Sequence, residues 1–298
     1  MMDNKLTVAL AQHAMVDEAE TNITTSLDWV AQAADAGARL VVLPELHRHR
    51  YFCKSQTRAF FDWAEPLQGP TLQALSSAAK AHGVVIVGSI FESRQAGLAS
   101  NTAIVVESDG SLAGVYRKMH IPDDPGYNEK YYFSPGDGGF QPIDTSVGRL
   151  GVLVCWDQWF PEAARLMALA GAEVLIYPTA IGWDPSDDET EQQRQLNAWQ
   201  IMHQAHAIAN GLPVIACNRV GYEDDPAGQY PAHFWGHSLI VGQQGEPLAP
   251  TLGTDPGLMH AQVDPGRTAT IRQQWPFLRD RRVDAYQGLT QRSLEQPK

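Results

Sequence analysis

The sequence predicts a single α/β domain in which two β-sheets pack face to face and helices cover both outer faces, a four-layer α-β-β-α sandwich. Strand-like apolar runs alternate with helix-like segments in both halves of the chain, and connections typical of antiparallel strands lie between them. The 298 residues are 44% hydrophobic, which is enough for a large core. Because no linker, repeat or low-complexity block divides the chain, we expect one domain over residues 1–298.

The first elements predict a β-α-β unit. Residues 6–12 form an apolar run typical of a strand. Residues 22–36 carry apolar side chains at helical spacing, and Gly37 ends this helix. Residues 40–43, Leu-Val-Val-Leu, predict the second strand. The chain therefore opens with a strand, a helix and a strand in the order that parallel sheets use.

In the next part of the chain, strands follow one another instead of alternating with helices. Residues 70–82 repeat the helical pattern up to Gly83, and residues 84–90 form an apolar strand. Two more apolar runs, residues 101–107 and 114–117, follow with no helix between them. The sequence thus predicts three neighbouring strands joined by short turns.

A loop rich in Asp, Pro and Gly covers residues 121–139 and separates the two halves. After it, residues 149–154 predict a buried strand. A helix is predicted over residues 161–170, since Pro161 lies in its first turn and Gly171 follows its last. The second half therefore begins, like the first, with a strand followed by a helix.

The remaining elements complete the second sheet and its helices. Residues 174–177 predict a strand, and residues 187–210 predict a long, polar and acidic helix. Residues 213–218 predict another strand, and a hairpin-like pair is expected around residues 243–246. Both halves then contain strands bracketed by helices, which favours two sheets over one.

Composition indicates the cellular compartment and the classes of partner to expect. The net charge of −12 disfavours nucleic acid as a partner. The longest apolar runs are far shorter than the ~20 residues of a membrane helix, so no membrane partner is expected. The cysteines Cys53, Cys155 and Cys217 show no close-spaced zinc or redox pattern, and the N-terminus does not resemble a signal peptide. We therefore expect a protein of the reducing cytoplasm.

Three residues with complementary chemistry each follow an apolar strand-like run. Glu45 ends Val-Val-Leu-Pro-Glu, Lys118 ends Val-Tyr-Arg-Lys, and Cys155 ends Gly-Val-Leu-Val-Cys. An acid, a base and a thiol could then meet at one edge of a sheet. A cysteine thiol has an ordinary pKa of about 8.5, so it needs a nearby carboxylate to take its proton or a cation to stabilise its thiolate. The trio predicts attack by a thiol on an amide-like carbon.

Each of these residues also has an ordinary structural explanation. Cys155 could be a small buried core residue, Glu45 a surface loop residue and Lys118 a solvated lysine. Only the combination favours catalysis. A metal site is not expected, since His203 and His206 lie three apart on a helix with no HExxH or paired-cysteine pattern beside them.

In order and context, these residues resemble the nitrilase superfamily of carbon–nitrogen hydrolases, whose members carry a Glu-Lys-Cys triad in an α-β-β-α sandwich. The resemblance runs from about residue 6 to residue 286. Its motifs are Leu-Pro-Glu at 43–45, Tyr-Arg-Lys at 116–118, and Cys-Trp-Asp at 155–157 with Pro-Glu at 161–162. The resemblance implies that the enzyme needs no metal or organic cofactor.

The resemblance also implies a role for individual residues. Glu45 matches the general base, Lys118 the stabiliser of the oxyanion and Cys155 the nucleophile. Glu129 matches a second glutamate that orients the lysine and the substrate. The backbone N–H of Trp156 would complete the oxyanion site.

Within the superfamily, three tracts look most like the N-carbamoylputrescine amidases: residues 51–53, 128–137 and 177–182. This resemblance implies hydrolysis of the ureido group of a small cationic substrate to putrescine, carbon dioxide and ammonia, a step of polyamine synthesis. The residues expected to bind the substrate are Tyr51, Trp156, Thr179, Ala180, Trp183 and Asp187.

Charged side chains near the predicted site do not decide between a cationic and an anionic substrate. Asp184, Asp187, Asp188 and Glu189 beside Trp183 favour a substrate that ends in an ammonium, although such acids can also cap the following helix. The basic segment at residues 47–50 would instead suit an anion. A carbamoyl amino acid such as β-ureidopropionate, an ω-amide, or a catalytically silent ligand-binding member of the fold therefore remain alternatives.

The resemblance implies a homodimer or a larger homo-oligomer. The segments expected to form it are the helix after Pro161 and a C-terminal extension that begins at about residue 270.

Overall fold

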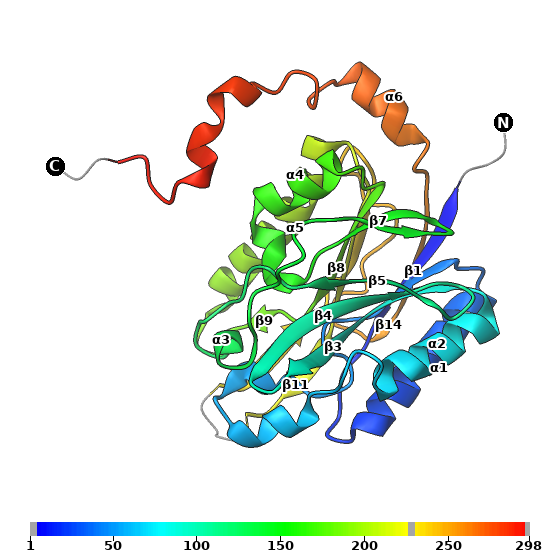
Figure 1. Cartoon of the computed structure of the whole chain (residues 1–298), viewed down its shortest axis with the longest axis vertical. Helices are drawn as coiled ribbons and strands as arrows, with labels where there is room; N and C mark the ends of the chain where they lie inside the picture. The colour runs from blue at the N-terminus through cyan, green and yellow to red at the C-terminus, as the bar shows by residue number, and fades with distance from the viewer. Residues whose placement is uncertain (1–4, 226–229, 296–298) are drawn as a thin grey trace.

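A computed structural model describes residues 5–225 and 230–295 of the chain. Two main β-sheets pack face to face, with α1 and α2 over one outer face and α4 and α5 over the other (Figure 1). This is the predicted four-layer α-β-β-α sandwich, and that prediction is confirmed.

The first sheet has six strands in the order β14-β1-β2-β3-β4-β5. Strands β1, β2 and β3 are parallel, and the other neighbours pair antiparallel. The strands are β1 (Leu6–Gln12), β2 (Leu40–Val42), β3 (Val85–Gln95), β4 (Leu98–Val106), β5 (Leu112–Arg117) and β14 (Gly257–Val263).

The second sheet has five strands in the order β13-β10-β8-β7-β6, and its three central strands are parallel. They are β6 (Ile143–Thr145), β7 (Gly148–Val152), β8 (Val174–Thr179), β10 (Val214–Asn218) and β13 (Leu239–Val241). A small third sheet pairs β11 with β12 and β12 with β9. Its strands are β9 (Gly182–Trp183), β11 (Val220–Glu223) and β12 (Ala232–Trp235).

Six α-helices and five short 3-10 helices are found in the described part of the chain, and none of them is long and apolar enough to cross a membrane. The α-helices are α1 (Ala19–Asp35), α2 (Pro70–His82), α3 (Glu129–Tyr132), α4 (Pro161–Leu169), α5 (Glu189–Asn210) and α6 (Arg267–Gln274). The 3-10 helices are η1 (Phe52–Lys54), η2 (Arg58–Trp63), η3 (Cys155–Trp159), η4 (Val283–Ala285) and η5 (Gln287–Thr290).

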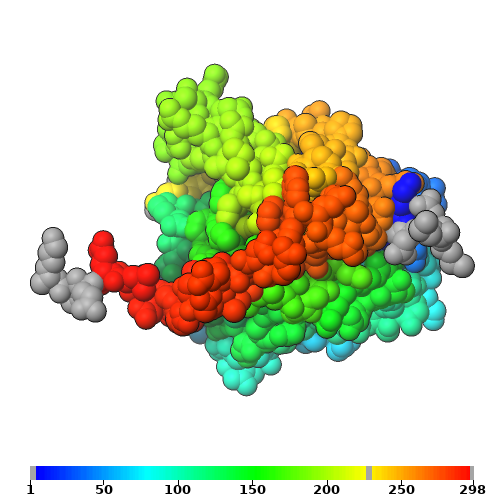
Figure 2. Space-filling model, turned by 90° about the horizontal axis from the view of Figure 1, so that it is seen from above, coloured from blue at the N-terminus to red at the C-terminus, as the bar shows by residue number. Residues whose placement is uncertain are grey.

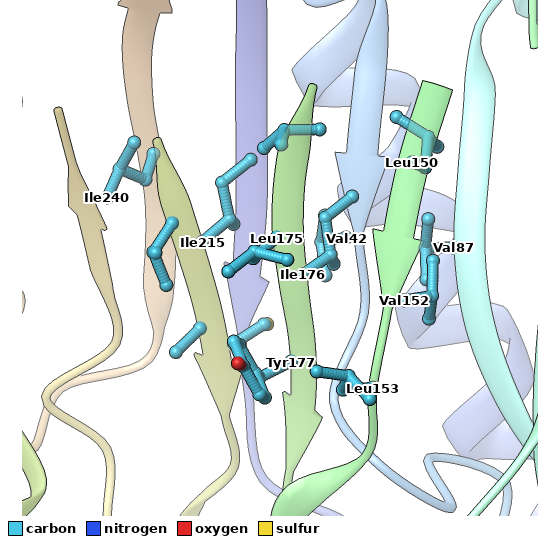
Figure 3. Packing of buried hydrophobic residues seen from close by; sticks show 14 of the residues in the cluster. Val42, Val87, Leu150, Val152, Leu153, Leu175, Ile176, Tyr177, Ile215 and Ile240 are labelled. Carbon is cyan, nitrogen blue, oxygen red and sulfur yellow. The ribbon is translucent and has the colours of Figure 1, made fainter. Parts of the chain in front are cut away.

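Strand β2 shows how side-chain alternation builds the layers. Leu40 and Val42 belong to the cluster between the two sheets, which also contains Val152 and other residues of the second sheet. Figure 3 shows Val42 among these residues. The intervening Val41 lies in a separate cluster with Leu75 of α2. Because successive side chains of a strand point to opposite faces, one apolar run serves both the central layer and the outer layer.

The sequence predicted the long elements closely and missed several short ones. Strand β1 and helix α2 have the predicted bounds, and α2 ends at Gly83 in the left-handed conformation that glycine adopts without strain. Helix α1 begins three residues earlier than predicted, and β3 extends five residues further. The hairpin expected around residues 243–246 is a turn closed by a single bridge between Val241 and Pro247, while β13 pairs with β10.

After α6, the C-terminal segment leaves the body of the protein as an extended arm (Figure 1). Seen from above, the arm runs across the molecule and beyond its edge (Figure 2). It carries several large apolar side chains that are exposed in the single chain: Trp275, Phe277, Val283, Tyr286, Leu289 and Leu294.

Acid should destabilise this fold through its buried histidines. Burial lowers the pKa of His13 to about 4 and that of His203 to about 3, from an ordinary value of 6.5. Below pH 6.5 the unfolded chain binds protons that the folded chain does not, so the free energy of unfolding falls as the pH falls. Each such histidine contributes up to about 1.4 kcal/mol per pH unit.

Urea unfolding at several pH values between 7 and 4.5 measures this loss. We expect His203→Gln to make the loss less steep, and the matched change at the exposed His82 to leave it as in the wild type. An equal pH dependence in the wild type and in His203→Gln would contradict this explanation.

Candidate active site

The ends of three strands bring Glu45, Lys118 and Cys155 to one place in the sandwich. Glu45 follows β2, Lys118 follows β5, and Cys155 begins the 3-10 helix η3 after β7. Lys118 Nζ lies 2.9 Å from Glu45 Oε1 and 2.7 Å from Glu129 Oε2, and all three side chains are buried. The predicted acid and base therefore meet, and the second glutamate joins them.

The two oxygens of Glu45 are in different environments. Oε1 accepts hydrogen bonds from Asn101 Nδ2 at 2.6 Å and from Lys118 Nζ at 2.9 Å. Oε2 is buried and has no hydrogen-bond partner among the described residues. Since a buried carboxylate oxygen without a donor is costly, Oε2 is the atom of this group best suited to receive a proton.

Glu129 holds Lys118 from the opposite side. Its Oε1 accepts a hydrogen bond from Tyr51 Oη at 2.7 Å, and both of its oxygens accept from Lys118 Nζ. Burial by itself would lower the pKa of Lys118, but the carboxylates of Glu129 and Glu45 outweigh it and raise the pKa well above its ordinary value. Lys118 is therefore a fixed positive charge whose side chain is completely buried.

Cys155, the candidate nucleophile, has a strained backbone conformation at the start of η3. Its φ of +41° lies in the left-handed region, which a residue with a side chain adopts at a cost. Burial raises the pKa of its thiol well above the ordinary value, and the charge of Glu45 raises it further. The thiol Sγ lies 3.9 Å from the carbonyl oxygen of Ala180. At neutral pH the sulfur keeps its proton, so attack requires a base that takes this proton as the bond forms.

A buried arginine supports the loop that carries Glu45. Leu46 has a φ of +49°, and Arg219 donates hydrogen bonds to the carbonyl oxygens of Glu45 at 2.6 Å and of Leu46 at 3.0 Å. Arg219 also pairs with Glu223 at 2.9 Å, whose other oxygen accepts from the backbone N–H of Tyr51 at 2.6 Å. The role of Arg219 was not predicted from the sequence. The signal that could have found it is a charged residue soon after an apolar strand, which is the pattern that singled out Glu45.

A cavity of about 470 Å³ opens onto Cys155. The acids Asp124 and Asp184 are among its lining residues, whereas no Arg, Lys or His of the described chain is. Most of its remaining wall is apolar or aromatic. The aromatic lining residues are Tyr127, Trp156, Trp159, Trp183, Tyr230 and Trp235.

Comparison with known proteins identifies the family. The sequence model of carbon-nitrogen hydrolases matches residues 7–273. The chain belongs to the carbon–nitrogen hydrolase family. The N-carbamoylputrescine amidase of Solanum lycopersicum is 43% identical over 95% of this chain and 94% of its own length. The citrullinase of Francisella tularensis is 39% identical over 96% and 98%. The crystal structure of a carbon-nitrogen hydrolase from Helicobacter pylori G27 is 48% identical, with a TM-score of 0.95 over 97% of this chain and all of that one.

The residues predicted to bind substrate fall into two groups in this carbon–nitrogen hydrolase. Trp156 and Trp183 line the cavity. Tyr51, Thr179 and Ala180 are buried and are not lining residues. Tyr51 donates a hydrogen bond to Glu129, and the carbonyl oxygen of Ala180 lies 3.9 Å from Cys155 Sγ. Both residues therefore contact side chains of the candidate site without lining the cavity.

The acidic segment before α5 has mostly local partners. Asp188 caps α5 by accepting from the backbone N–H of Glu191, and Asp187 accepts from Gln195 Nε2 at 2.8 Å. Neither of them is a lining residue of the cavity, whereas Asp184 is. Asp124, from the loop at residues 121–139, is a lining residue that the sequence analysis did not identify.

None of the residues of the basic segment 47–50 lines the cavity of the hydrolase. Arg48 pairs with Glu20 at the start of α1, and Arg50 pairs with Asp17 at 3.0 Å. Because both arginines bind acids beside α1, they do not offer their charge to a substrate in the cavity.

The histidines of α5 have structural partners in this hydrolase. His203 Nδ1 bonds the carbonyl oxygen of Trp199 at 2.8 Å, and His206 Nε2 bonds that of Gln158 at 2.7 Å. No group of three or more His, Cys, Asp or Glu in residues 5–225 and 230–295 is arranged to hold a metal ion.

Alkylation should single out Cys155. Cys155 lines the cavity, whereas Cys53 and Cys217 are fully buried and do not. We expect one equivalent of iodoacetamide to modify Cys155 and to spare the other two, as read by mass spectrometry of peptides. Because burial raises the pKa of the thiol, the rate should still be rising between pH 7 and pH 9. Equal modification of all three cysteines would contradict the assignment.

Proposed function

We propose that the protein hydrolyses N-carbamoylputrescine to putrescine, carbon dioxide and ammonia. The observation that carries the proposal is a thiol at a cavity lined by aromatic and acidic residues, with the buried Glu45, which has one unpartnered oxygen, and the buried Lys118 both close enough to shift the pKa of that thiol. The similarity to plant N-carbamoylputrescine amidases over nearly the whole chain supports the substrate.

In the first half of the reaction, Cys155 forms a bond to the ureido carbon. Its proton passes to Glu45, where Oε2 has no other partner. The carbonyl oxygen takes the negative charge and is stabilised by Lys118 Nζ and by the backbone N–H of Trp156. When the tetrahedral intermediate collapses, the proton on Glu45 goes to the leaving nitrogen. Ammonia departs, and the carbamoyl group stays on the sulfur as a thioester.

In the second half, water replaces ammonia. Glu45 takes a proton from the water as the water oxygen attacks the thioester carbon, and Lys118 again stabilises the oxyanion. The carbon–sulfur bond breaks and the sulfur regains a proton from Glu45. The product is a carbamic acid, which decomposes to putrescine and carbon dioxide. No metal or organic cofactor takes part in this scheme.

The lining of the cavity favours a substrate whose far end is an ammonium. The carboxylates of Asp124 and Asp184 offer opposite charge, and the indole of Trp183 offers an aromatic face. A carbamoyl amino acid ends in a carboxylate, which proteins usually bind with arginine. Since no described lining residue is positively charged, such a substrate would enter this cavity without a partner for its carboxylate.

The first test measures ammonia release by the purified protein from N-carbamoylputrescine, citrulline, carbamoyl-β-alanine, a carbamoyl-D-amino acid and an ω-amide at equal concentrations. We expect the carbamoyl diamine to have the highest kcat/KM. Citrulline carries a carboxylate beside its amine and should be slower. A higher kcat/KM for an anionic substrate would overturn the substrate assignment, and turnover retained by Cys155→Ala would overturn the mechanism.

A neighbouring pair of acids provides a matched control for the ammonium site. Asp124→Asn removes a lining carboxylate and should raise KM for the carbamoyl diamine about tenfold, the size of one favourable charge contact. Asp123→Asn changes the adjacent exposed acid, which does not line the cavity, and should leave KM unchanged. An equal rise in KM for both variants would mean that the two acids act only by long-range attraction, and it would contradict an ammonium site at Asp124.

We further propose that the chain forms a homo-oligomer of the reducing cytoplasm. All three cysteines are free, as such a compartment favours. The C-terminal arm exposes large apolar side chains that water disfavours, and Leu166 and Leu169 of α4 are exposed as well. A second copy of the chain would cover both surfaces.

Light scattering after gel filtration tests this assembly. Val283→Asp combined with Leu289→Asp places charges on the arm and should reduce the mass toward the 32.7 kDa of one chain. Val16→Asp changes an exposed valine near the N-terminus and should leave the mass unchanged. A wild-type mass of 32.7 kDa would contradict the proposal.

A further inference from the structure

The carboxylate of Asp157 lies two residues after Cys155 and is completely buried. Its two oxygens accept four hydrogen bonds. Oδ2 accepts from the backbone N–H of Val154 at 2.9 Å and from Tyr116 Oη at 2.9 Å. Oδ1 accepts from the backbone N–H of His120 at 3.0 Å and from His120 Nδ1 at 2.7 Å. Four donors on one buried carboxylate far exceed what capping a short helix requires.

These donors come from two segments that belong to different sheets. Val154 directly precedes Cys155, after β7 of the five-stranded sheet. Tyr116 and His120 lie two residues before and two residues after Lys118, at the end of β5, the edge strand of the six-stranded sheet. One side chain therefore joins the backbone that carries the thiol to the backbone that carries the ammonium.

The turn at Cys155 needs such a restraint. Its φ of +41° lies in the left-handed region, which a residue with a side chain adopts only at a cost, so the surroundings must impose it. Asp157 closes the turn twice, because its N–H donates to the carbonyl oxygen of Val154 at 3.0 Å while its side chain accepts from the N–H of Val154. The ring of His120 also stacks on that of Phe160, the residue directly after η3, with the ring centroids 3.7 Å apart.

We propose that Asp157 is a positioning residue that fixes the separation between the Cys155 thiol and the Lys118 ammonium across the two sheets. Asp157 does not line the cavity, so it acts through the turn and not on the substrate. An error of about 1 Å between reacting groups is enough to slow an enzyme a hundredfold. The proposal rests on Cys155 as the nucleophile and does not depend on the identity of the substrate.

Two buried tyrosines provide the test. Tyr116→Phe removes one bond between Asp157 and the Lys118 segment, and the ring stays in place. Tyr177→Phe makes the same chemical change at a hydroxyl that is buried and has no hydrogen-bond partner among the described residues. We expect Tyr116→Phe to lower kcat about tenfold with KM nearly unchanged, the effect of losing one hydrogen bond to a charged group. Tyr177→Phe should keep the wild-type values.

Alkylation of Cys155 by iodoacetamide gives a readout that needs no substrate. If Asp157 sets the distance to Lys118, Tyr116→Phe should slow alkylation and move its pH midpoint upward, because the thiolate is then farther from the ammonium. Asp157→Asn should enlarge both changes, measured at a temperature where circular dichroism shows it folded. A wild-type rate and pH profile in folded Tyr116→Phe would overturn the proposal, as would equal losses in Tyr116→Phe and Tyr177→Phe. Full turnover by Cys155→Ala would instead overturn the proposed function.

Discussion

The contact of Lys118 with two buried carboxylates is the constraint on which the rest of the site depends. Taking three ionisable groups out of water costs several kcal/mol for each charge, and close, hydrogen-bonded partners of opposite charge offset that cost. Lys118 Nζ meets Glu45 at 2.9 Å and Glu129 at 2.7 Å, while Asn101 and Tyr51 donate to the same two carboxylates. Substitution of Asn101 or Tyr51 would therefore remove a hydrogen bond from a buried charge.

The sandwich supplies the rigidity that this group needs. Glu45 and Lys118 follow β2 and β5 of one sheet, and Cys155 follows β7 of the other, so their separation depends on how the two sheets pack. The apolar cluster between the sheets, shown in part in Figure 3, fixes that packing. Buried polar networks then place the individual loops, with Arg219 holding the Glu45 loop.

The sequence was most informative where one local pattern determined the outcome. Helix α2 has its predicted bounds because Pro70 and Gly83 mark its two ends, whatever packs against it. Strand β14 was missed, since residues 257–263 mix polar and apolar side chains and become a strand by pairing with β1 at the far end of the chain. For the same reason Asp124 and Arg219 were not identified. Their positions depend on loops and strands that meet only in the folded protein.

The protonated state of the thiol explains why the site is built from buried charges and not from an exposed, activated cysteine. Burial raises the pKa of Cys155, so the sulfur keeps its proton until a substrate arrives. In the proposed mechanism, the proton moves to Glu45 and the net charge of the buried group stays the same. The attack of the sulfur then places the negative charge on the substrate oxygen, beside the fixed charge of Lys118. Because charge only shifts within a preorganised cluster, little solvent must reorganise, and the thiol is spared side reactions between turnovers.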